Sequence, residues 1–538
     1  MEFPPILSSL LATILATALL FVTVLHRGRS CCVRKYNLPP GPRPWPVIGN
    51  LNLIGQLPHH SLHKLSLHKY LVCRVFEKKH SVKSATLGKR RICRSEYGSV
   101  MSLRLGSVPG VVGSSVEAAR FFLKTHDLVF IDRPKTAAAR YIMYNYFNRL
   151  WAPYGAYWRQ ARKLWQTELL SARRLRAQER VRAEEVRAIL RGLHAASSSS
   201  SAVTIREHLL TLNLNVISRM VLGNKQCAEE LKWMIEELFF LNGVVNVGDF
   251  IPWLGWLDLQ GGWAGCMFDR FLEHVLGEHE ERRRREGDGF VAVDVVDQLL
   301  ELADDANLEV PIQRNGIKVF TLDLITAGTD PSAVTVEWAM SELLKHPEVL
   351  AKATEELDRV LGRDRLVVTE GDIPSLPYVE SVVKETMRMH PVAPLLAQRL
   401  SREDTSFSGY HIPEGTRVLV NVWAIGRDPA VWDAPEEFRP ERFLGSGGVD
   451  VRGHDFQLLP FGSGRRMCPG ISLGLKMVHL SLANLLHAFT WRLPNGVSTE
   501  ELSMEEKFGL SVVRMVPLQV VAEPKLPAHL YAAPGLDA

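Results

Sequence analysis

A cysteine-centred loop near the C-terminus is the part of the sequence best suited to chemistry. Residues 461–470 read FGSGRRMCPG, and an apolar helical pattern follows at 471–488. The glycines would let the backbone approach a flat ligand closely, and a position just before a helix favours the thiolate form of Cys468. Arg465 and Arg466 supply positive charge for a thiolate or for carboxylates on a ligand. A purely structural cysteine in a glycine turn would not need a phenylalanine and two arginines at these offsets.

This loop resembles the cysteine loop of the cytochrome P450 family, F-x-x-G-x-R-x-C-x-G, at every fixed position. The resemblance runs from a proline-rich segment near residue 40 to the C-terminus, about nine tenths of the chain. It implies that Cys468 is the axial thiolate ligand of a haem b (iron-protoporphyrin IX) iron, where a thiolate donates electron density that favours O–O cleavage. It also implies that Arg466 pairs with a haem propionate and that Phe461 packs near the sulfur.

Two charged motifs precede the loop in the order that the family has them. Residues 385–388 read ETMR, like the family's E-x-x-R. Glu385 and Arg388 stand at i and i+3, so they share a helix face and the carboxylate can hold the guanidinium. Residues 440–443 read PERF, like the family's P-E-R-F, and Arg442 would then complete a buried charge network. Either pair alone would be read as a surface salt bridge; together, ahead of the cysteine loop, they resemble the family's structural lock on the haem side.

Further candidates for haem contact lie elsewhere in the chain. Residues 158–162 read WRQAR and match the family's W-x-x-x-R. The match implies that Trp158 and Arg162 reach a propionate, and Arg399, after the helix that carries Glu385, is a third candidate partner. The cofactor-binding set implied by the resemblance is therefore Trp158, Arg162, Arg399, Phe461, Arg466 and Cys468.

The expected oxygen-activating helix departs from the family pattern. Residues 327–331 read AGTDP, where the family has A-G-x-[DE]-T, so Pro331 replaces the usual threonine. The resemblance makes Thr329 and Asp330 the candidate catalytic residues. In the family, the threonine hydroxyl bonds to the carbonyl one turn earlier and helps to deliver protons. Proline has no hydroxyl, and it also removes a main-chain hydrogen bond and is expected to kink the helix.

Composition and charge are those of an ordinary globular protein. Of the 538 residues 46% are hydrophobic and 23% charged, with a net charge of +5, far from the disordered range. No basic stripe with interleaved aromatic residues recurs, so no nucleic-acid partner is expected. The seven cysteines are irregularly spaced, without a CxxC pair, which argues against a disulfide framework and against a cysteine zinc site.

The N-terminus carries a candidate membrane anchor. Residues 6–25 form a nearly unbroken apolar run, which at about 1.5 Å per residue spans the ~30 Å hydrocarbon core. Basic residues follow this run, and such a flank stays on the cytosolic side. We therefore expect residues 1–28 to be a single-pass anchor in the endoplasmic reticulum membrane, with the catalytic domain at 47–538 facing the cytosol. Between them, residues 29–46 are basic and proline-rich and would form a stiff hinge.

A basic segment at 69–94 stands apart from the family pattern. It holds nine Lys or Arg residues against one acid, Glu77, without an amphipathic period. A solvated basic loop is a more ordinary interpretation than a nucleic-acid site, and contact with a membrane surface is the functional alternative. In the family, a helix like that at 60–67 is followed directly by a sequence like that at 96–98. We therefore expect 69–94 to be an atypical insertion that lies outside the core.

Hydrophobic patterns predict a mainly α-helical fold with a minor β-sheet region, and no βαβ rhythm. This is the cytochrome P450 fold that the resemblance implies. The predicted strands are 102–105, 110–112 and 416–424, and the main predicted helices are 169–194, 228–243, 264–286, 313–344 and 471–488.

Substrate and membrane contacts are assigned to less regular segments. By resemblance, the substrate would contact 141–151, residues beside Ala327, 392–397 and 508–512, although simple core packing explains these residues equally well. Their aromatic and aliphatic mixture suggests a lipophilic substrate of small to moderate size. The loop at 250–257, with two tryptophans, is expected to dip into the lipid bilayer.

The segments 132–134 (DRP) and 151–155 (WAPYG) resemble the large plant microsomal branch that oxidises terpenoids and phenolics. Within it, the chain looks nearest to flavonoid-hydroxylase-like or homoterpene-forming sequences. The resemblance implies a monooxygenase that inserts one oxygen atom of O₂ into a lipophilic small molecule. Its electrons would come from NADPH through the membrane-bound NADPH-cytochrome P450 reductase. Two alternatives remain open: a reductase-independent haem-thiolate enzyme that rearranges hydroperoxides, and a non-enzymatic haem-binding or scaffolding protein.

Overall fold

The computed structural model describes residues 13, 17, 36–67, 97–197, 201–224, 228–243, 246–255, 262–445 and 448–532. Nearly all of the expected anchor at 1–28, the first part of the hinge and the whole basic segment at 69–94 lie outside the described residues. None of the helices in the described part of the chain is both long enough and apolar enough to span a membrane.

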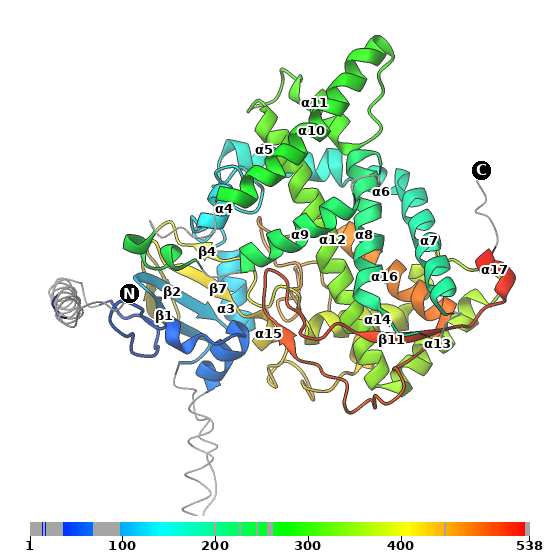
Figure 1. Ribbon diagram of the computed structural model, residues 1–538. Coiled ribbons are helices and arrows are strands. Elements are labelled where there is room, and N and C mark those ends of the chain that lie inside the picture. Colours follow the sequence, from blue (N-terminus) through cyan, green and yellow to red (C-terminus); the bar gives the residue numbers. More distant parts are fainter. Residues whose placement is uncertain are drawn as a thin grey trace, which may run out of the picture.

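The described residues are mainly helical, as the sequence predicts (Figure 1). A helix at 58–67 precedes the first strand. The other helices are α3 (Val116–Arg120), α4 (Ala137–Tyr141), α5 (Ala156–Leu164), α6 (Ala172–Ala177), α7 (Glu179–Ser197), α8 (Ile205–Leu222), α9 (Ala228–Gly243), α10 (Gly262–Glu286), α11 (Val295–Ala303), α12 (Arg314–Lys345), α13 (Pro347–Leu361), α14 (Pro377–Met389), α15 (Val422–Ile425), α16 (Ile471–Ala488) and α17 (Ala528–Ala532).

The strands form small separate sheets. The largest has the order β1-β2-β7-β4, in which β2 and β7 run parallel and the other neighbours antiparallel. A second sheet has the order β3-β11-β8, and β5-β6 and β9-β10 are two-stranded. The strands are β1 (Val100–Leu105), β2 (Val108–Gly113), β3 (Val203–Thr204), β4 (Arg399–Leu400), β5 (Thr405–Phe407), β6 (Tyr410–Ile412), β7 (Arg417–Val420), β8 (Phe489–Arg492), β9 (Glu506–Lys507), β10 (Val513–Arg514) and β11 (Gln519–Pro524).

Two predicted elements are wrong in extent. The strand predicted at 416–424 ends at Val420, because the Asn421 side chain accepts a hydrogen bond from the backbone N–H of Ala424 and so begins α15. The helix predicted at 169–194 is divided into α6 and α7 at Gln178. Apolar periodicity continues across both boundaries, so it does not reveal where the backbone turns.

Helix α12 is the centre of the helical part, and the β1-β2-β7-β4 sheet lies to one side of that part (Figure 1). The helix contacts α8, α16 and α14 most extensively, and also α10, α11 and α13. Its second half is almost entirely buried, with Trp338 as one of the largest fully buried side chains. Most of the hydrophobic core forms around this helix, which makes it a fixed wall for any site that lies against it.

Candidate active site

The cysteine loop is a tight turn that leads into α16. Gly462 and Gly464 have φ angles of +68° and +73°, a conformation that side chains rarely adopt. The N–H of Cys468 donates to the carbonyl of Phe461 (3.0 Å), which closes the turn. The half-buried Cys468 thiol thus stands three residues before the first residue of α16, Ile471, at the positive end of the helix dipole.

One arginine of the loop has a different role from the one that the sequence suggests. Arg465 donates to Asp127 (2.5 Å) through its guanidinium, so its charge is neutralised by a protein carboxylate. It fastens the loop to the turn after α3 and is not available to a ligand. The Ser463 hydroxyl holds the other side of the loop by donating to the carbonyl of Gly453 (2.7 Å).

The exposure of Ala327 implies an open space, here called the cavity, beside the middle of α12 and near the cysteine loop. Ala327 is exposed although neighbouring helices enclose α12, and Asp330 and Pro331 are half-buried. A Cβ built on Gly474 of α16 would lie 3.6 Å from the Phe461 ring and 4.0 Å from the Ser332 hydroxyl. The loop therefore sits against α12 one turn beyond the exposed alanine. This cavity could accept a flat ligand between α12 and Cys468.

The two candidate catalytic residues lie on different faces of α12. Asp330 is about 60° around the helix from Ala327, on the cavity side, whereas Thr329 is about 200° away. Thr329 is almost fully buried, and its hydroxyl donates to the carbonyl of Ile325 (2.7 Å). Of the pair, only Asp330 is placed to act on something in the cavity.

Pro331 is accommodated within the helix. Helix α12 continues from Arg314 to Lys345 through the proline. The nearest hydroxyl one turn later, that of Thr335, donates to the Pro331 carbonyl (2.8 Å). Its proton is therefore committed to the main chain, away from the position at which the family carries its threonine.

Three of the predicted propionate partners share an unusual electrostatic environment. Arg466 donates to the carbonyls of Ile131 (2.9 Å) and Ala152 (2.6 Å). Arg162 donates to the carbonyl of Met467 (2.5 Å) and Arg399 to that of Ser463 (3.1 Å). Within the described part of the chain, none of the three forms an ion pair, and Nη1 of Arg399 is buried without any hydrogen-bond partner.

The pKa values of these three arginines are lowered, as expected for buried cations without an ion-pair partner in the described residues. Burial lowers the pKa of Arg399 to about 10. It lowers that of Arg466 to about 9, helped by the charges of Arg149 and Arg399, and that of Arg162 to about 10, helped by Arg149. A dianionic ligand would relieve this repulsion. The arginines and the cavity therefore fit a haem, whose propionates these guanidinium groups would hold and whose iron the Cys468 thiolate would bind.

Trp158 acts on this cluster through Arg466. Its indole N–H donates to the carbonyl of Arg149 (3.1 Å), and the Arg466 guanidinium lies over its ring, 4.7 Å from the centroid. Both contacts fix the orientation of Arg466. Direct contact between Trp158 and a propionate remains a prediction.

Three polar residues of the site were not predicted from the sequence. Arg133 donates to the carbonyls of Ala397 (2.5 Å) and Gln398 (2.6 Å), and burial and the charges of neighbouring arginines lower its pKa. Arg149 is half-buried, and burial lowers its pKa against the opposing charges of Cys468 and Asp323. Asp323 could have been found, since it precedes Ala327 by four residues on the same helix face. The two arginines carry no spacing signal.

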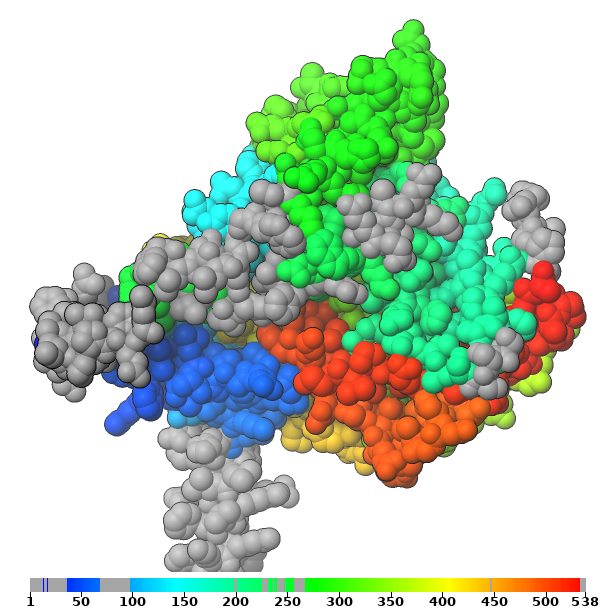
Figure 2. Space-filling view, in the orientation of Figure 1, coloured from blue at the N-terminus to red at the C-terminus, as the bar shows by residue number. Residues whose placement is uncertain are grey.

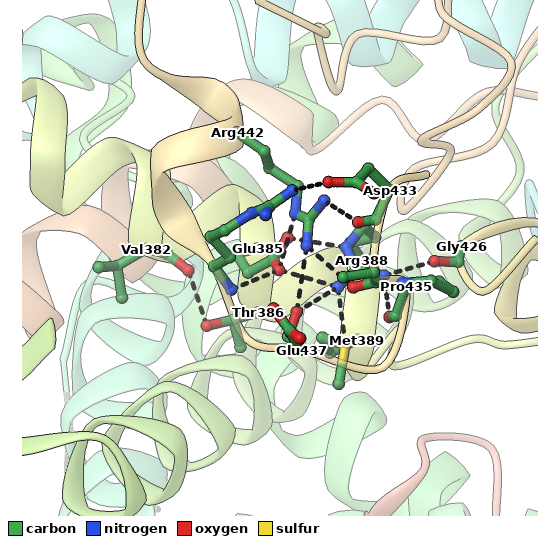
Figure 3. A network of polar contacts seen from close by, with 12 residues as sticks. Val382, Glu385, Thr386, Arg388, Met389, Gly426, Asp433, Pro435, Glu437 and Arg442 are labelled. Carbon is green, nitrogen blue, oxygen red and sulfur yellow. Dashed lines mark hydrogen bonds and ion pairs between the residues drawn. The ribbon is translucent and has the colours of Figure 1, made fainter. Parts of the chain in front are cut away.

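The predicted charge network is present and buried (Figure 3). Arg388 donates to both carboxylate oxygens of Glu385 (2.7 and 2.8 Å), as the i, i+3 spacing predicts, and both side chains are fully buried. Arg442, from the short helix at Pro440–Phe443, donates to the same carboxylate (3.0 Å). Two motifs distant in sequence thus meet at one carboxylate between α14 and the segment before the cysteine loop.

Comparisons with known proteins agree with this geometry. The chain matches the model of the cytochrome P450 family over residues 75–517. It is 50% identical to trimethyltridecatetraene synthase from Zea mays, over 94% of this chain and 91% of that one. It is 40% identical to flavonoid 3'-monooxygenase from Petunia hybrida, over 97% and 98% of the two chains.

A solved zebra fish cytochrome P450, crystallised with abiraterone, has a similar fold. The TM-score is 0.67 at 26% sequence identity, over 80% of this chain and 97% of that one. Family match, relatives and fold agree with the motifs that meet around the cavity. The chain belongs to the cytochrome P450 family and is a P450 monooxygenase.

Proposed function

We propose that this protein oxidises a lipophilic terpenoid with O₂ and with electrons that NADPH supplies through a membrane-bound reductase. The observation that carries the oxidation chemistry is the half-buried Cys468 just before α16, in a loop beside three arginines that form no ion pair within the described residues. Haem, when bound there, supplies the oxidising chemistry through its thiolate-ligated iron. The terpenoid class is supported by the 50% identity to a relative whose name denotes a branched hydrocarbon with four double bonds.

The protein's own residues position the reactants. Arg162, Arg399 and Arg466 would hold the propionates and so fix the plane of the cofactor. Ala327 leaves room for the substrate beside α12, and Asp330 on the same side can accept and pass on protons that enter with water. The lipophilic walls of such a site exclude bulk water and orient the substrate.

A phenolic substrate is the second candidate, because a flavonoid 3'-monooxygenase matches nearly the whole chain. One experiment separates the candidates. The full-length protein in membranes with a plant reductase and NADPH is given acyclic terpenoid alcohols, flavonoids, and, without NADPH, a fatty-acid hydroperoxide. NADPH-dependent oxidation of a terpenoid alcohol is expected. Turnover of flavonoids alone would refute the terpenoid class, and turnover of the hydroperoxide alone would refute the monooxygenase reaction.

We further propose that the protein is held at the endoplasmic reticulum membrane with its catalytic domain in the cytosol. Support comes from the apolar run at 6–25 and from two exposed tryptophans, Trp45 and Trp253. Their segments lie together, since the Gly106 N–H donates to Ile48 and the Ser107 N–H donates to Phe250. Exposed indoles of this kind prefer the headgroup boundary.

The membrane proposal is tested with a protein that lacks residues 1–29. It should still sediment partly with vesicles of plant phospholipids, because the tryptophans remain. Replacing Trp45 and Trp253 by Ser should release it, whereas the same change at Trp233, which is exposed on α9, should not. Complete solubility of the truncated protein would refute a membrane contact by these segments.

A further inference from the structure

Two histidines and a glutamate meet outside the cysteine loop and its arginines. His59 and His60 lie on the helix at 58–67, and Glu506 lies on β9, more than 400 residues later. Nε2 of His59 is 2.7 Å from Oε2 of Glu506, and Nε2 of His60 is 3.2 Å from the same oxygen. The N-terminal part of the chain, blue in Figure 2, lies directly against the orange-red C-terminal part. Neither the sequence motifs nor the haem site accounts for this cluster.

The arrangement matches the donor set of a divalent transition-metal ion. Three ligand atoms, one from each residue, lie within 4.8 Å of one another. A tetrahedral Zn²⁺ ion with bonds of about 2.0–2.1 Å separates neighbouring ligand atoms by about 3.3 Å. The two distances to Glu506, 2.7 and 3.2 Å, therefore need to grow by about 0.6 and about 0.1 Å. Two imidazoles and a carboxylate are ligands that Zn²⁺ accepts with a water molecule in the fourth position.

One aromatic ring lies against both histidines of the cluster. The Trp423 ring is 5.6 Å from the His59 ring and 4.2 Å from the His60 ring, centroid to centroid. The guanidinium of Arg427 lies over the same Trp423 ring, 4.0 Å from its centroid.

An unsatisfied ring nitrogen is the second, independent observation. His59 is completely buried. Nε2 of His60 is buried and faces the Glu506 carboxylate, yet it forms no hydrogen bond with it. The rest of the His60 side chain is 31% exposed, which gives an ion and its water a route from solvent. Buried imidazole nitrogens without partners cost free energy unless something else binds them.

We propose that His59, His60 and Glu506 form a binding site for a divalent transition-metal ion, Zn²⁺ being the best fit. The ion would tie the helix at 58–67 to the β9-β10 hairpin. Residues 508–512, a segment expected to contact substrate, join the two strands of that hairpin. The N–H of Val512 donates to the carbonyl of Val392 (2.9 Å), which lies in another such segment, 392–397. Metal occupancy would therefore fix the position of one substrate-contacting segment.

The test measures zinc directly in the full-length haem protein. After treatment with a chelator and then with ZnCl₂, the desalted protein should hold one more equivalent of zinc than the His60→Ala variant does. Glu506→Gln should weaken zinc binding at least about tenfold. The matched control is His63→Ala, on the same helix and also against Trp423, which should retain the zinc. Equal zinc in the parent protein and His60→Ala would overturn the proposal, as would loss of zinc in His63→Ala.

Two further readouts separate the site from other effects. The carbon monoxide difference spectrum should be unchanged in His60→Ala and His63→Ala, which shows that the haem domain is folded. Because the chain has seven cysteines, X-ray absorption at the zinc edge should show nitrogen and oxygen neighbours only. A sulfur neighbour would place the zinc on a cysteine elsewhere and refute the assignment.

Discussion

Replacing Glu385 by Gln tests the buried charge network most directly, because the change removes one charge and almost no volume. Oε1 of Glu385 accepts from Arg388, from Arg442 and from the backbone N–H of Arg439, and Oε2 accepts from Arg388 alone. A glutamine can keep its oxygen at the first position. Its amide nitrogen would then face the donor Nε of Arg388 and leave that guanidinium without a counter-charge.

The expected cost follows from the burial of both partners. Arg388 is fully buried and also donates to the carbonyls of Gly426 (2.5 Å) and Pro435 (2.7 Å), which cannot neutralise it. Breaking a buried ion pair on one side costs about 3–5 kcal/mol, against a total folding free energy of about 5–15 kcal/mol. Glu385→Gln should therefore accumulate mostly as protein without haem and unfold at a lower urea concentration.

The assay combines haem content with a double-mutant cycle. Haem per chain and the urea midpoint by circular dichroism are measured for Glu385→Gln, Arg388→Met and the double variant. The double variant removes both fully buried charges and leaves only Arg442 without its carboxylate. It should therefore lose less stability than the two single variants together, by about 0.5–3 kcal/mol.

A surface pair supplies the control for this cycle. Asp433 pairs with Arg439 at 2.8 Å, and its side chain is 85% exposed, so Asp433→Asn should leave the midpoint within error. Normal haem content in Glu385→Gln, or strict additivity in the cycle, would refute the reasoning.

Four other outcomes are expected. Cys468→Ala should abolish the thiolate carbon monoxide spectrum and all turnover, because a methyl group cannot donate to iron; a retained spectrum would disprove the ligand assignment. Arg399→Met should lower haem retention during dialysis about tenfold or more, since a charge-assisted hydrogen bond is lost; unchanged retention would contradict the propionate role. Pro331→Thr should raise the ratio of product to NADPH consumed and lower hydrogen peroxide release; a fall in that ratio would mean that the proline serves a specialised mechanism. Burial opposes the charge on Glu342, but hydrogen bonds from His346 and His390 outweigh it and lower the pKa of Glu342 to about 2. The ionised carboxylate therefore adds about 3 kcal/mol to the free energy of unfolding above pH 4.5, and this contribution is lost as the pH falls towards 2. Urea unfolding measured against pH should show a smaller loss of stability at low pH in Glu342→Gln.

The motif residues were predictable because their roles depend on local spacing. An i, i+3 pair on one helix, such as Glu385 and Arg388, is set by helix geometry before any tertiary contact forms. The turn before α16 is likewise predicted by two glycines of the loop, Gly462 and Gly464. In both cases the sequence separation that matters is a few residues.

Other features depend on contacts that no local pattern contains. Arg465 and Arg466 are neighbours, yet one pairs with Asp127 and the other reaches carbonyls around residues 131 and 152. Which of them faces a ligand depends on how the turn after α3 docks, and spacing does not encode that. Spacing likewise does not show which of Thr329 and Asp330 is accessible, because only the packing of α8 against α12 determines which face of α12 is covered.

The arginine cluster connects the fold to its cofactor. A pKa of about 9 for Arg466, against an ordinary value of 12.5, corresponds to about 5 kcal/mol of unfavourable burial and repulsion while the group is charged. The folded pKa is the lower one, so this cost is fully present below pH 9 and is relieved only as the pH rises towards 12.5. At neutral pH the protein cannot relieve it by losing a proton. A dianionic ligand beside Arg162, Arg399 and Arg466 can, and the relief adds to its binding free energy. The same charges that destabilise the empty fold therefore select a ligand with two carboxylates.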